Sequence, residues 1–550
     1  MANNPHAEPT RQIASRTAED GTIHAKTHLT PKACTTRVRI AVPPSKVIPV
    51  IVIPGIMGSN LRARQDGQSK NEALRPGEVA WRPPNGPANG LKEAKKWKAR
   101  DGAARQRILH GQTLDVDDTG EINIAPDGNG RAISVDIARE RGWGEIHADS
   151  YGLLLSTLHV YLNSAFRAVY EHCEVEDHWL HINLFDRALW GATRAGVTAS
   201  LTDEEIAKFA EFHYPVYACG YNWLESNELS SQRLEARIHK IIGFWKKSGS
   251  RCEQVVLVTH SMGGLVARAC ARRIPEKIKG VIHGVMPALG APACYRRIAC
   301  GTEKSSPSNG GIANAAMATF SKIAGETSQE TTPVLAIAPG PLELLPNQMF
   351  PKPWLFAVAE VGNKEMRNIL QLPEGSPYDL YREANAWYRL FDMSLVDPTN
   401  RYRGLAEKYV KAALNDAERF HSSLGDYYHP ITYAYYCDDA SHLTFGSCRW
   451  ITSSKRGEIS RETVMQGKLL SRGWEDSRNV ELPNGTNIVF QIGAQDASGD
   501  GTVPAVSGAG PQNKVKSLFR VTGFDHQGSY ATEAMLKLTL HLVVRIANEP

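Results

Sequence analysis

Apolar residues along this chain occur in short continuous runs separated by amphipathic stretches. The continuous runs suit strands that are buried on both faces, and they lie at residues 47–53, 216–221, 254–258 and 281–286. Between them, apolar residues recur at helical spacing over residues 229–247, and small and apolar residues fill 264–273. Strands that alternate with helices predict a mostly parallel central sheet with helices on both faces, joined by right-handed crossovers.

This alternation is interrupted twice. Residues 62–140 are rich in Gly, Pro, Lys and Asp, and we expect them to form an irregular insertion within a first core part that spans 38–300. Beyond it, residues 301–425 turn from a Ser-, Gly- and Ala-rich stretch to aromatic helical segments, which predicts a helical cap over one end of the sheet. Strand patterns and a final amphipathic helix return over 426–550, the second core part, whereas the polar residues 1–37 are expected to be a flexible leader.

The aromatic residues of the cap allow two interpretations. They are Tyr378, Tyr381, Trp387, Tyr388, Phe391 and Tyr402. As a lid, the rings would cover an apolar acyl-binding site and open at a lipid surface. As a structural unit, they would simply fill the interior of a small helical layer. The sequence favours neither interpretation.

Composition and charge narrow the class of protein. The chain has 550 residues, of which 42% are hydrophobic and 22% charged, as in a globular protein with a large core. Its net charge of +5 is spread without an arginine-rich tract, so nucleic-acid binding is not indicated. The nine cysteines are scattered, which disfavours zinc knuckles and favours buried thiols. A local bridge is the alternative, either Cys437–Cys448 or Cys294–Cys300.

The N-terminal sequence bears on targeting. Residues 1–21 lack the apolar core of a Sec signal. No apolar run approaches the ~18 residues that would span a bilayer. We therefore expect synthesis in the cytoplasm and, for any export, a route that uses no cleaved signal.

Ser261 carries the strongest chemical signal in the chain. It lies in VLVTHSMGG (256–264), where an apolar strand runs directly into a turn followed by a helix of small residues. This is the context of a nucleophile elbow, and Gly263 supplies the small neighbour that the strained turn requires. Thr259 replaces the first glycine of the usual pattern. The structural alternative is that Ser261 merely caps the helix, and we favour the nucleophile.

A nucleophilic serine needs a base, and the base needs an orienting acid. In a strand–turn–helix arrangement of this kind the chain order is serine, acid, histidine. Asp500 in SGDGTVP and His526 in GFDHQG follow Ser261 in that order, both between glycines that permit close approach. The competing acids are Asp496, Asp438 and Asp439, and the competing bases are His442 and His541. His260 adjoins the nucleophile in sequence but should point away from its Oγ.

Attack on an ester produces an oxyanion, which requires donors that are already in place. One is expected to be the backbone N–H of Met262, the residue after the nucleophile. The second is expected from the glycine-rich loop after the first strand, IPGIMGS, where the N–H of Ile56 is the candidate. Gly55 and Gly58 would let this loop approach the substrate. A plain Gly/Pro turn is the structural alternative.

No metal or cofactor motif is present. The sequence has no HExxH, EF-hand, CxxC, P-loop or dinucleotide-binding pattern, so we predict neither a metal nor a cofactor. A calcium ion held by loop carboxylates, which needs no sequence signature, stays open.

Together these motifs resemble those of the lecithin–cholesterol acyltransferase-like lipases, which are α/β-hydrolases that act on lipid esters. The segments that carry the resemblance are IPGIMGSNL (53–61), THSMGG (259–264), MPALGAP (286–292), PLELLP (341–346) and SGDGTVP (498–504), followed by His526. The resemblance implies an α/β-hydrolase fold with an inserted helical cap. It also implies Ser261, Asp500 and His526 as catalytic residues.

A second set of segments is similar to bacterial lipase effectors of the type VI secretion system. They are GWGEIHADSYG (142–152), VYACGYNWLESN (216–227), HGVMPALGAPA (283–293) and HPITYAYY (429–436). This resemblance implies an antibacterial phospholipase that reaches the periplasm of a target cell, with membrane phospholipid as substrate. It further implies a cognate immunity protein and a component of the secretion apparatus as partners.

Several alternatives remain open from the sequence. An acyltransferase or a deacylase of lipid anchors would use the same three residues, and a catalytically silent hydrolase fold would serve binding alone. Head-group preference, sn-position and oligomeric state have no sequence signature here.

Overall fold

The structure is a computed structural model. It describes residues 11–13, 15–25, 38–40, 42–67, 69–127, 131–169, 172–191, 198–361, 365–453 and 459–550. Most of the expected leader, residues 1–37, lies outside the described residues. Its described part forms three short strands, β1 (Arg11–Ile13), β2 (Ser15–Thr17) and β3 (Ile23–Ala25). β1 pairs with β4 (Val38–Ile40) in parallel, and β2 and β3 form an antiparallel pair.

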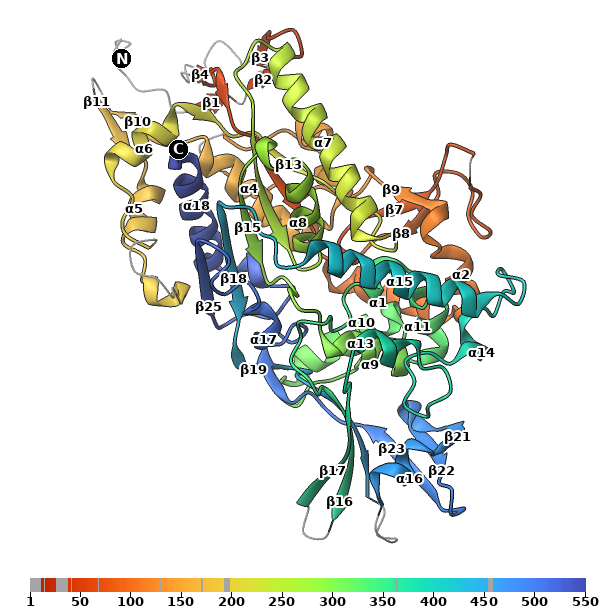
Figure 1. The fold of residues 1–550 in the computed structure, drawn as a ribbon. Coiled ribbons are helices and arrows are strands. Elements are labelled where there is room, and N and C mark those ends of the chain that lie inside the picture. Colours follow the sequence, from red (N-terminus) through yellow and green to blue (C-terminus); the bar gives the residue numbers. More distant parts are fainter. Residues whose placement is uncertain are drawn as a thin grey trace.

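A six-stranded parallel sheet forms the centre of the fold (Figure 1). In spatial order its strands are β13 (Val216–Ala218), β6 (Val50–Ile53), β14 (Val255–His260), β15 (Ile278–Gly284), β18 (Thr432–Cys437) and β25 (Ser517–Val521). All five neighbouring pairs are parallel. The strands predicted from the apolar runs are therefore confirmed, and β6 and β14, buried at every position, lie at the middle of the sheet.

Helices cover both faces of this sheet. Ile51 and Leu257 point to one face, where they pack with α7 (Asn227–Lys247) and α8 (Gly263–Arg273). Val52 and Val258 point to the other face, where they pack with α4 (Ala148–Leu162) and α18 (Glu533–Asn548). Alternate residues of one strand thus fill two separate cores, as the continuous apolar runs require.

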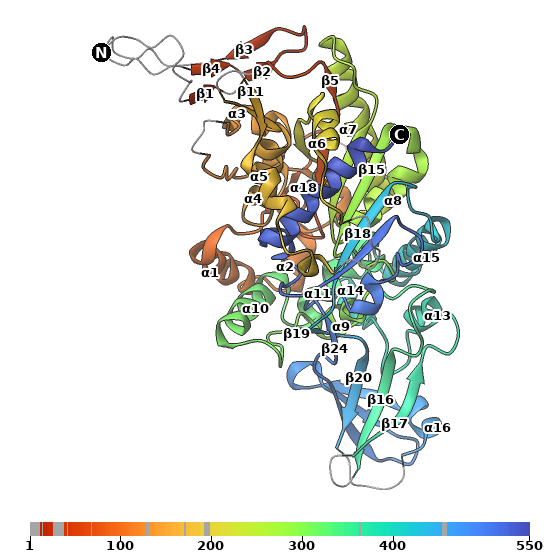
Figure 2. The same ribbon diagram turned by 90° about the vertical axis from the view of Figure 1, so that its left-hand side faces the viewer.

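The segment predicted as a helical cap, 301–425, consists mainly of helices and loops, and it also contributes two strands that the sequence did not predict. β16 (Leu355–Val361) and β17 (Glu365–Leu372) come from the cap segment, but they join strands from beyond residue 425. The resulting six-stranded mixed sheet has the order β17–β16–β20–β23–β22–β21, with β20 (Cys448–Thr452), β23 (Asn487–Ile492), β22 (Arg478–Glu481) and β21 (Lys468–Arg472). Figure 2 shows this second sheet extending away from the central one. β23, one of the strand patterns expected within 426–550, therefore exists but lies outside the central sheet.

Helices of the cap segment lie between the two sheets. They are α10 (Gly311–Ala324), α11 (Ser328–Leu335), α12 (Pro339–Leu342), α13 (Pro377–Arg382), α14 (Met393–Val396) and α15 (Ala406–Leu424). α9 (Pro292–Cys300), which ends just before the segment, packs against α11. The rings of Tyr378, Tyr381, Trp387, Tyr388 and Phe391 are all buried in a third core beneath the second sheet. Their positions fit the packing interpretation of the aromatic segment.

The insertion predicted to be irregular also has regular structure. β7 (Leu61–Ala63), β8 (Val79–Trp81) and β9 (Leu114–Val116) form a three-stranded antiparallel sheet. Two helices, α1 (Gly86–Lys98) and α2 (Gly102–Ile108), connect its strands. Strands of only three residues, set between Gly- and Pro-rich turns, show too little periodicity for the sequence to predict them.

The described cysteines are free thiols. Cys294, Cys300, Cys437 and Cys448 are all among them, so neither local bridge that the sequence left open is formed. Burial raises the pKa of the Cys437 thiol to about 12. In the described part of the chain, no helix combines the length and the apolar character needed to cross a membrane.

Buried histidines make the fold sensitive to mild acid. Burial lowers the pKa of His159, His260 and His283 to about 3, and that of His178 and His421 to about 4. In the unfolded chain the pKa of each histidine is ~6.5. Below that pH the unfolded chain therefore binds more protons than the folded chain, and the free energy of unfolding falls as the pH falls from 6.5 towards 4. Each histidine can contribute up to ~1.4 kcal/mol per pH unit.

We therefore expect the thermal unfolding midpoint to drop steeply between pH 7 and pH 5, before most carboxylates titrate. Differential scanning calorimetry across this range measures the effect. A midpoint that stays constant from pH 7 to pH 5 would show that these imidazoles are not buried as neutral groups.

Candidate active site

Ser261 lies on a strained turn at the carboxyl end of β14. Its φ of 52° is in the left-handed region, which a non-glycine residue seldom adopts. The turn is held by two backbone hydrogen bonds, from the Ser261 N–H to the Gly284 carbonyl at 2.9 Å and from the Gly264 N–H to the Ser261 carbonyl at 2.9 Å. α8 begins two residues later. This is the geometry expected of a nucleophile elbow.

The structure brings Ser261, His526 and Asp500 together, although they are far apart in sequence. The Ser261 Oγ lies 2.8 Å from His526 Nε2, and His526 Nδ1 lies 2.7 Å from Asp500 Oδ2. Asp500 and Ser261 are buried, and the His526 side chain keeps 14% of its surface exposed. A hydroxyl, an imidazole and a carboxylate in this order can generate a nucleophilic alkoxide by proton transfer to the imidazole.

Asp500 is positioned by a short strand pair that the sequence did not reveal. β24 (Ala497–Gly499) pairs with β19 (Asp439–Thr444), which continues the chain beyond β18 of the central sheet. Two backbone hydrogen bonds then fix the orientation of the Asp500 carboxylate. Its Oδ1 accepts from the N–H groups of Thr502 at 2.9 Å and Val503 at 2.7 Å. Oδ2 stays available to His526.

The competing residues have other partners. Asp496 accepts from the Gly446 N–H at 2.8 Å and pairs with Arg449, and Asp439 accepts from the Gly523 N–H at 2.9 Å. His442 pairs with Asp439, and His541 is fully buried in α18 beside Trp190. Asp438 pairs with Arg520 at 2.7 Å. None of these contacts reaches Ser261.

The loop after β6 lies directly against the nucleophile. A side chain at Gly55 would come within 2.9 Å of Ser261 Cβ, and one at Gly263 would come within 2.4 Å of the Pro54 carbonyl. Glycine at both positions therefore permits the close approach that the sequence predicted. Within the described residues, the N–H groups of Ile56 and Met262 donate to no protein acceptor, so both can serve an oxyanion.

Two further residues link this loop to His526, and the sequence did not assign them to the site. The Tyr151 hydroxyl accepts from the Gly55 N–H at 2.9 Å and lies 2.9 Å from His260 Nδ1. His260 Nε2 in turn lies 2.8 Å from the His526 carbonyl oxygen. Tyr151 belongs to the GWGEIHADSYG segment, so a sequence signal was present without a role attached to it.

The direction of each hydrogen bond in this chain follows from the groups involved. A carbonyl only accepts, so His260 Nε2 must carry the proton. Burial and the neighbouring His526 lower the pKa of His260 to about 3, which keeps its Nδ1 an acceptor, and burial raises the pKa of Tyr151. The phenol therefore donates to His260, and Gly55 donates to the phenol. One buried network thus joins the loop after β6 to the backbone of His526.

Replacement of Tyr151 by Phe tests this positioning role. The change leaves the Gly55 N–H and His260 Nδ1 without partners, which costs about 1–3 kcal/mol of folding free energy. We expect kcat to fall roughly tenfold or more, with a smaller change in KM, because misplacement of catalytic groups acts on the transition state. Tyr214→Phe is the matched control, since that buried hydroxyl donates to the Phe209 carbonyl at 3.0 Å, away from the site. Equal losses of kcat in both variants would contradict the role.

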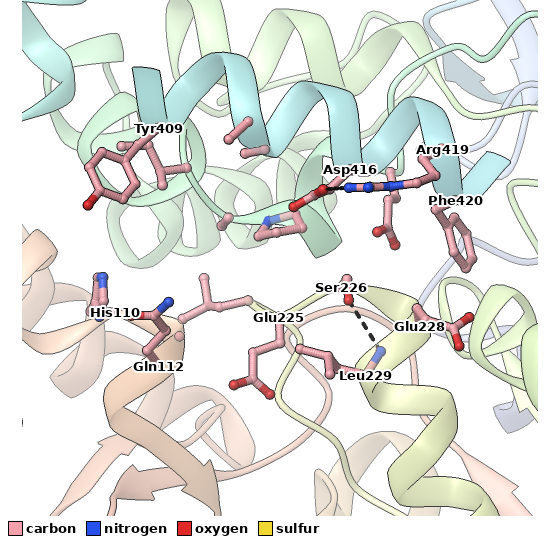
Figure 3. Close-up of a pocket in the computed structure, with 18 of the residues that line it drawn as sticks. His110, Gln112, Glu225, Ser226, Glu228, Leu229, Tyr409, Asp416, Arg419 and Phe420 are labelled. Atoms are coloured by element: carbon pink, nitrogen blue, oxygen red, sulfur yellow. Dashed lines mark hydrogen bonds and ion pairs between the residues drawn. The ribbon is translucent and has the colours of Figure 1, made fainter. Parts of the chain in front are cut away.

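The described cavities include one that lies apart from this site. A cavity of about 790 Å³ separates α15 from the start of α7, and its lining contains neither Ser261 nor His526 (Figure 3). Leu229 and Phe420 face it from opposite sides. Ser261 itself is only 3% exposed. Among the described residues, no group of three or more His, Cys, Asp or Glu side chains is arranged to hold a metal ion.

Comparison with known proteins agrees with the fold of the central sheet and its helices. Residues 216–300, which contain β13, α7, β14, α8 and β15, match the PGAP1-like alpha/beta domain family. The chain has the α/β-hydrolase fold. Among proteins with curated descriptions, none matches the sequence.

A solved structure extends the similarity to most of the chain. One chain in the crystal structure of the Tle4–Tli4 complex is 28% identical in sequence and superposes with a TM-score of 0.72. The match covers 91% of this chain and 98% of that one. The resemblance to type VI lipase effectors is thereby confirmed, and a lipase-like hydrolase is supported by both matches.

Proposed function

We propose that this chain is a serine phospholipase that hydrolyses carboxylic esters of membrane glycerophospholipids through an acyl-serine intermediate. The observation that carries the proposal is the continuous hydrogen-bonded line from Ser261 Oγ through His526 to Asp500. The strained φ of Ser261 and the two unengaged N–H groups beside it support the same reaction.

The reaction follows from these positions. His526 Nε2 takes the proton of Ser261 as Oγ attacks the ester carbonyl carbon, and Asp500 stabilises the imidazolium through Nδ1–H. The N–H groups of Ile56 and Met262 bind the oxyanion of the tetrahedral intermediate. Collapse breaks the ester bond, and His526 returns the proton to the departing lysophospholipid alkoxide. Water, deprotonated by His526, then attacks the acyl-serine. The bond between the acyl carbon and Ser261 Oγ breaks, His526 returns the proton to Oγ, and the fatty acid is released.

The biological setting is proposed from the type VI resemblance. A phospholipase of this kind would act on membranes of a competing bacterium after delivery to its periplasm. The similarity to a chain from the Tle4–Tli4 complex supports a protein partner that blocks the enzyme in the producing cell. A component of the secretion apparatus would be the second partner.

Product analysis tests the proposed reaction. The full chain is incubated with phospholipid vesicles, and fatty acid and lysophospholipid are identified by mass spectrometry. Equal amounts of the two products are expected. Fatty acid found on an added alcohol instead of as free acid would assign an acyltransferase. Intact phospholipid throughout, with a correctly folded chain, would refute the proposed substrate class.

A further inference from the structure

α10 exposes a stripe of apolar residues to solvent, although its last turn buries Ile323 in the core. Ile312, Ala316 and Phe320 are spaced four residues apart, so they form one stripe along the helix. Ile312 is 92% exposed and Phe320 42% exposed, and Ala316 is exposed between them. An ordinary surface helix has the reverse arrangement, with its apolar stripe against the core.

The polar residues of α10 face the protein. Asn314 accepts from the Ser306 N–H at 2.9 Å and donates to the Asn309 carbonyl at 3.2 Å. Ser321 is fully buried and donates to the Ala318 carbonyl at 3.0 Å. These contacts set the rotation of α10 about its axis, and they leave the apolar stripe on the solvent side.

α1 packs beside α10 and adds both an apolar and a basic surface. Gly90 of α1 faces Thr319 of α10, and the next residue, Leu91, is 65% exposed. Lysines follow on the exposed side of the same helix, at Lys92, Lys95 and Lys96. Figure 2 shows the two helices side by side at one edge of the molecule.

One buried guanidinium holds the two helices together. Arg105 of α2 donates to the carbonyls of Lys322 and Ile323 at the end of α10, each at 2.8 Å. It also donates to the Trp97 carbonyl at the end of α1 at 2.9 Å. Arg105 is only 1% exposed, so these hydrogen bonds, which join the ends of both helices, are shielded from water.

This surface adjoins the candidate active site. The start of α1 is bound to the start of α4, where the Gly86 N–H donates to Asp149 at 2.5 Å. The next residue, Ser150, accepts a hydrogen bond from Gln527, the neighbour of His526. A flat lipid surface that contacts α1 and α10 would therefore lie at the edge of the site.

We propose that α1 and α10 form a docking surface for a bilayer that carries anionic phospholipid headgroups. Ile312, Phe320 and Leu91 enter the boundary between headgroups and acyl chains, and the α1 lysines contact the phosphates. The combination of an apolar stripe with neighbouring cations fits this partner, because both attractions act together at an anionic membrane. The inference rests on the proposed function, since it explains how a phospholipase would meet its substrate.

Vesicle binding tests the surface independently of turnover, because it can be measured on the Ser261→Ala chain. Co-sedimentation with phosphatidylglycerol-containing vesicles is compared for that chain and for the same chain with Ile312→Gln and Phe320→Gln. We expect the two substitutions to lower the affinity at least about tenfold. Leu184→Gln is the matched control, since this leucine is 83% exposed at the end of α5 (Asp177–Asn183). Affinity within twofold of the parent in the α10 variant would overturn the proposal.

The lysines of α1 allow a second test, because their contribution to vesicle binding should depend on the charge of the lipid. Replacement of Lys92, Lys95 and Lys96 by Gln should lower binding about tenfold or more on anionic vesicles and leave binding to phosphatidylcholine vesicles unchanged. Added salt should weaken the binding of the parent chain to anionic vesicles and leave its binding to phosphatidylcholine vesicles unchanged. Equal loss on both vesicle types would contradict an anionic partner. Self-association that Ile312→Gln abolishes in the absence of vesicles would assign the stripe to a second copy of the chain instead.

Discussion

Replacement of Ser261 by Ala is expected to reduce fatty-acid release from phospholipid vesicles by about 10⁴-fold or more. The substitution removes the Oγ that hydrogen-bonds to His526 Nε2, and among the described residues no other hydroxyl hydrogen-bonds to that nitrogen. Stability should change little, because Ala meets the same strain as Ser at a φ of 52° and fits the same space. Release of fatty acid is measured together with thermal unfolding.

Ser231→Ala is the matched control for this experiment. Ser231 is also fully buried, and its hydroxyl donates to the Glu228 carbonyl at 2.7 Å on α7, away from the site. This variant should keep nearly full activity. Fatty-acid release that survives in Ser261→Ala would contradict the assignment of the nucleophile.

Replacement of Asp500 by Asn is expected to lower kcat by roughly 10³–10⁴-fold with little change in substrate affinity. The structure gives the reason. Oδ1 accepts from the Thr502 and Val503 N–H groups, so the amide oxygen of Asn must take that position. The amide NH₂ then donates to His526 Nδ1, so the imidazole proton must lie on Nε2. A protonated Nε2 cannot accept the proton of Ser261.

Asp496→Asn provides the comparison, because Asp496 was the competing acid in the sequence. Its carboxylate binds the Gly446 and Ser447 N–H groups and Arg449, so the variant should lose stability more than activity. Steady-state kinetics of both variants separates the two aspartates. An active Asp500→Asn beside an inactive Asp496→Asn would reverse the assignment.

The sequence predicted the central sheet well because its strands are buried on both faces. Val50–Ile53 and Val255–His260 are apolar at almost every position, and the intervening helices show clear periodicity. The motif at Ser261 could be placed for the same reason, since the strand and the helix around it were both evident. The order of acid and histidine along the chain then identified Asp500 and His526 as candidates.

The second sheet could not be predicted because its strands come from distant parts of the chain. β16 pairs with β20 across 93 positions of sequence, and nothing local indicates this partner. The same limit concealed β24 and β19, the pair that positions Asp500. Tyr151 was missed for a related reason. Its hydroxyl gains a role only when α4 brings it to Gly55 and His260.

The most direct test of the account is covalent labelling with a serine-directed fluorophosphonate probe, followed by mass spectrometry of the digested chain. A reactive Ser261 should carry the label, and Asp500→Asn should label far more slowly. Label at Ser261 would establish an activated nucleophile whatever the natural substrate is. The labelling is carried out in the presence of detergent-dispersed lipid. A folded wild-type chain that is not labelled at Ser261, or is labelled at another serine instead, would contradict the proposed mechanism.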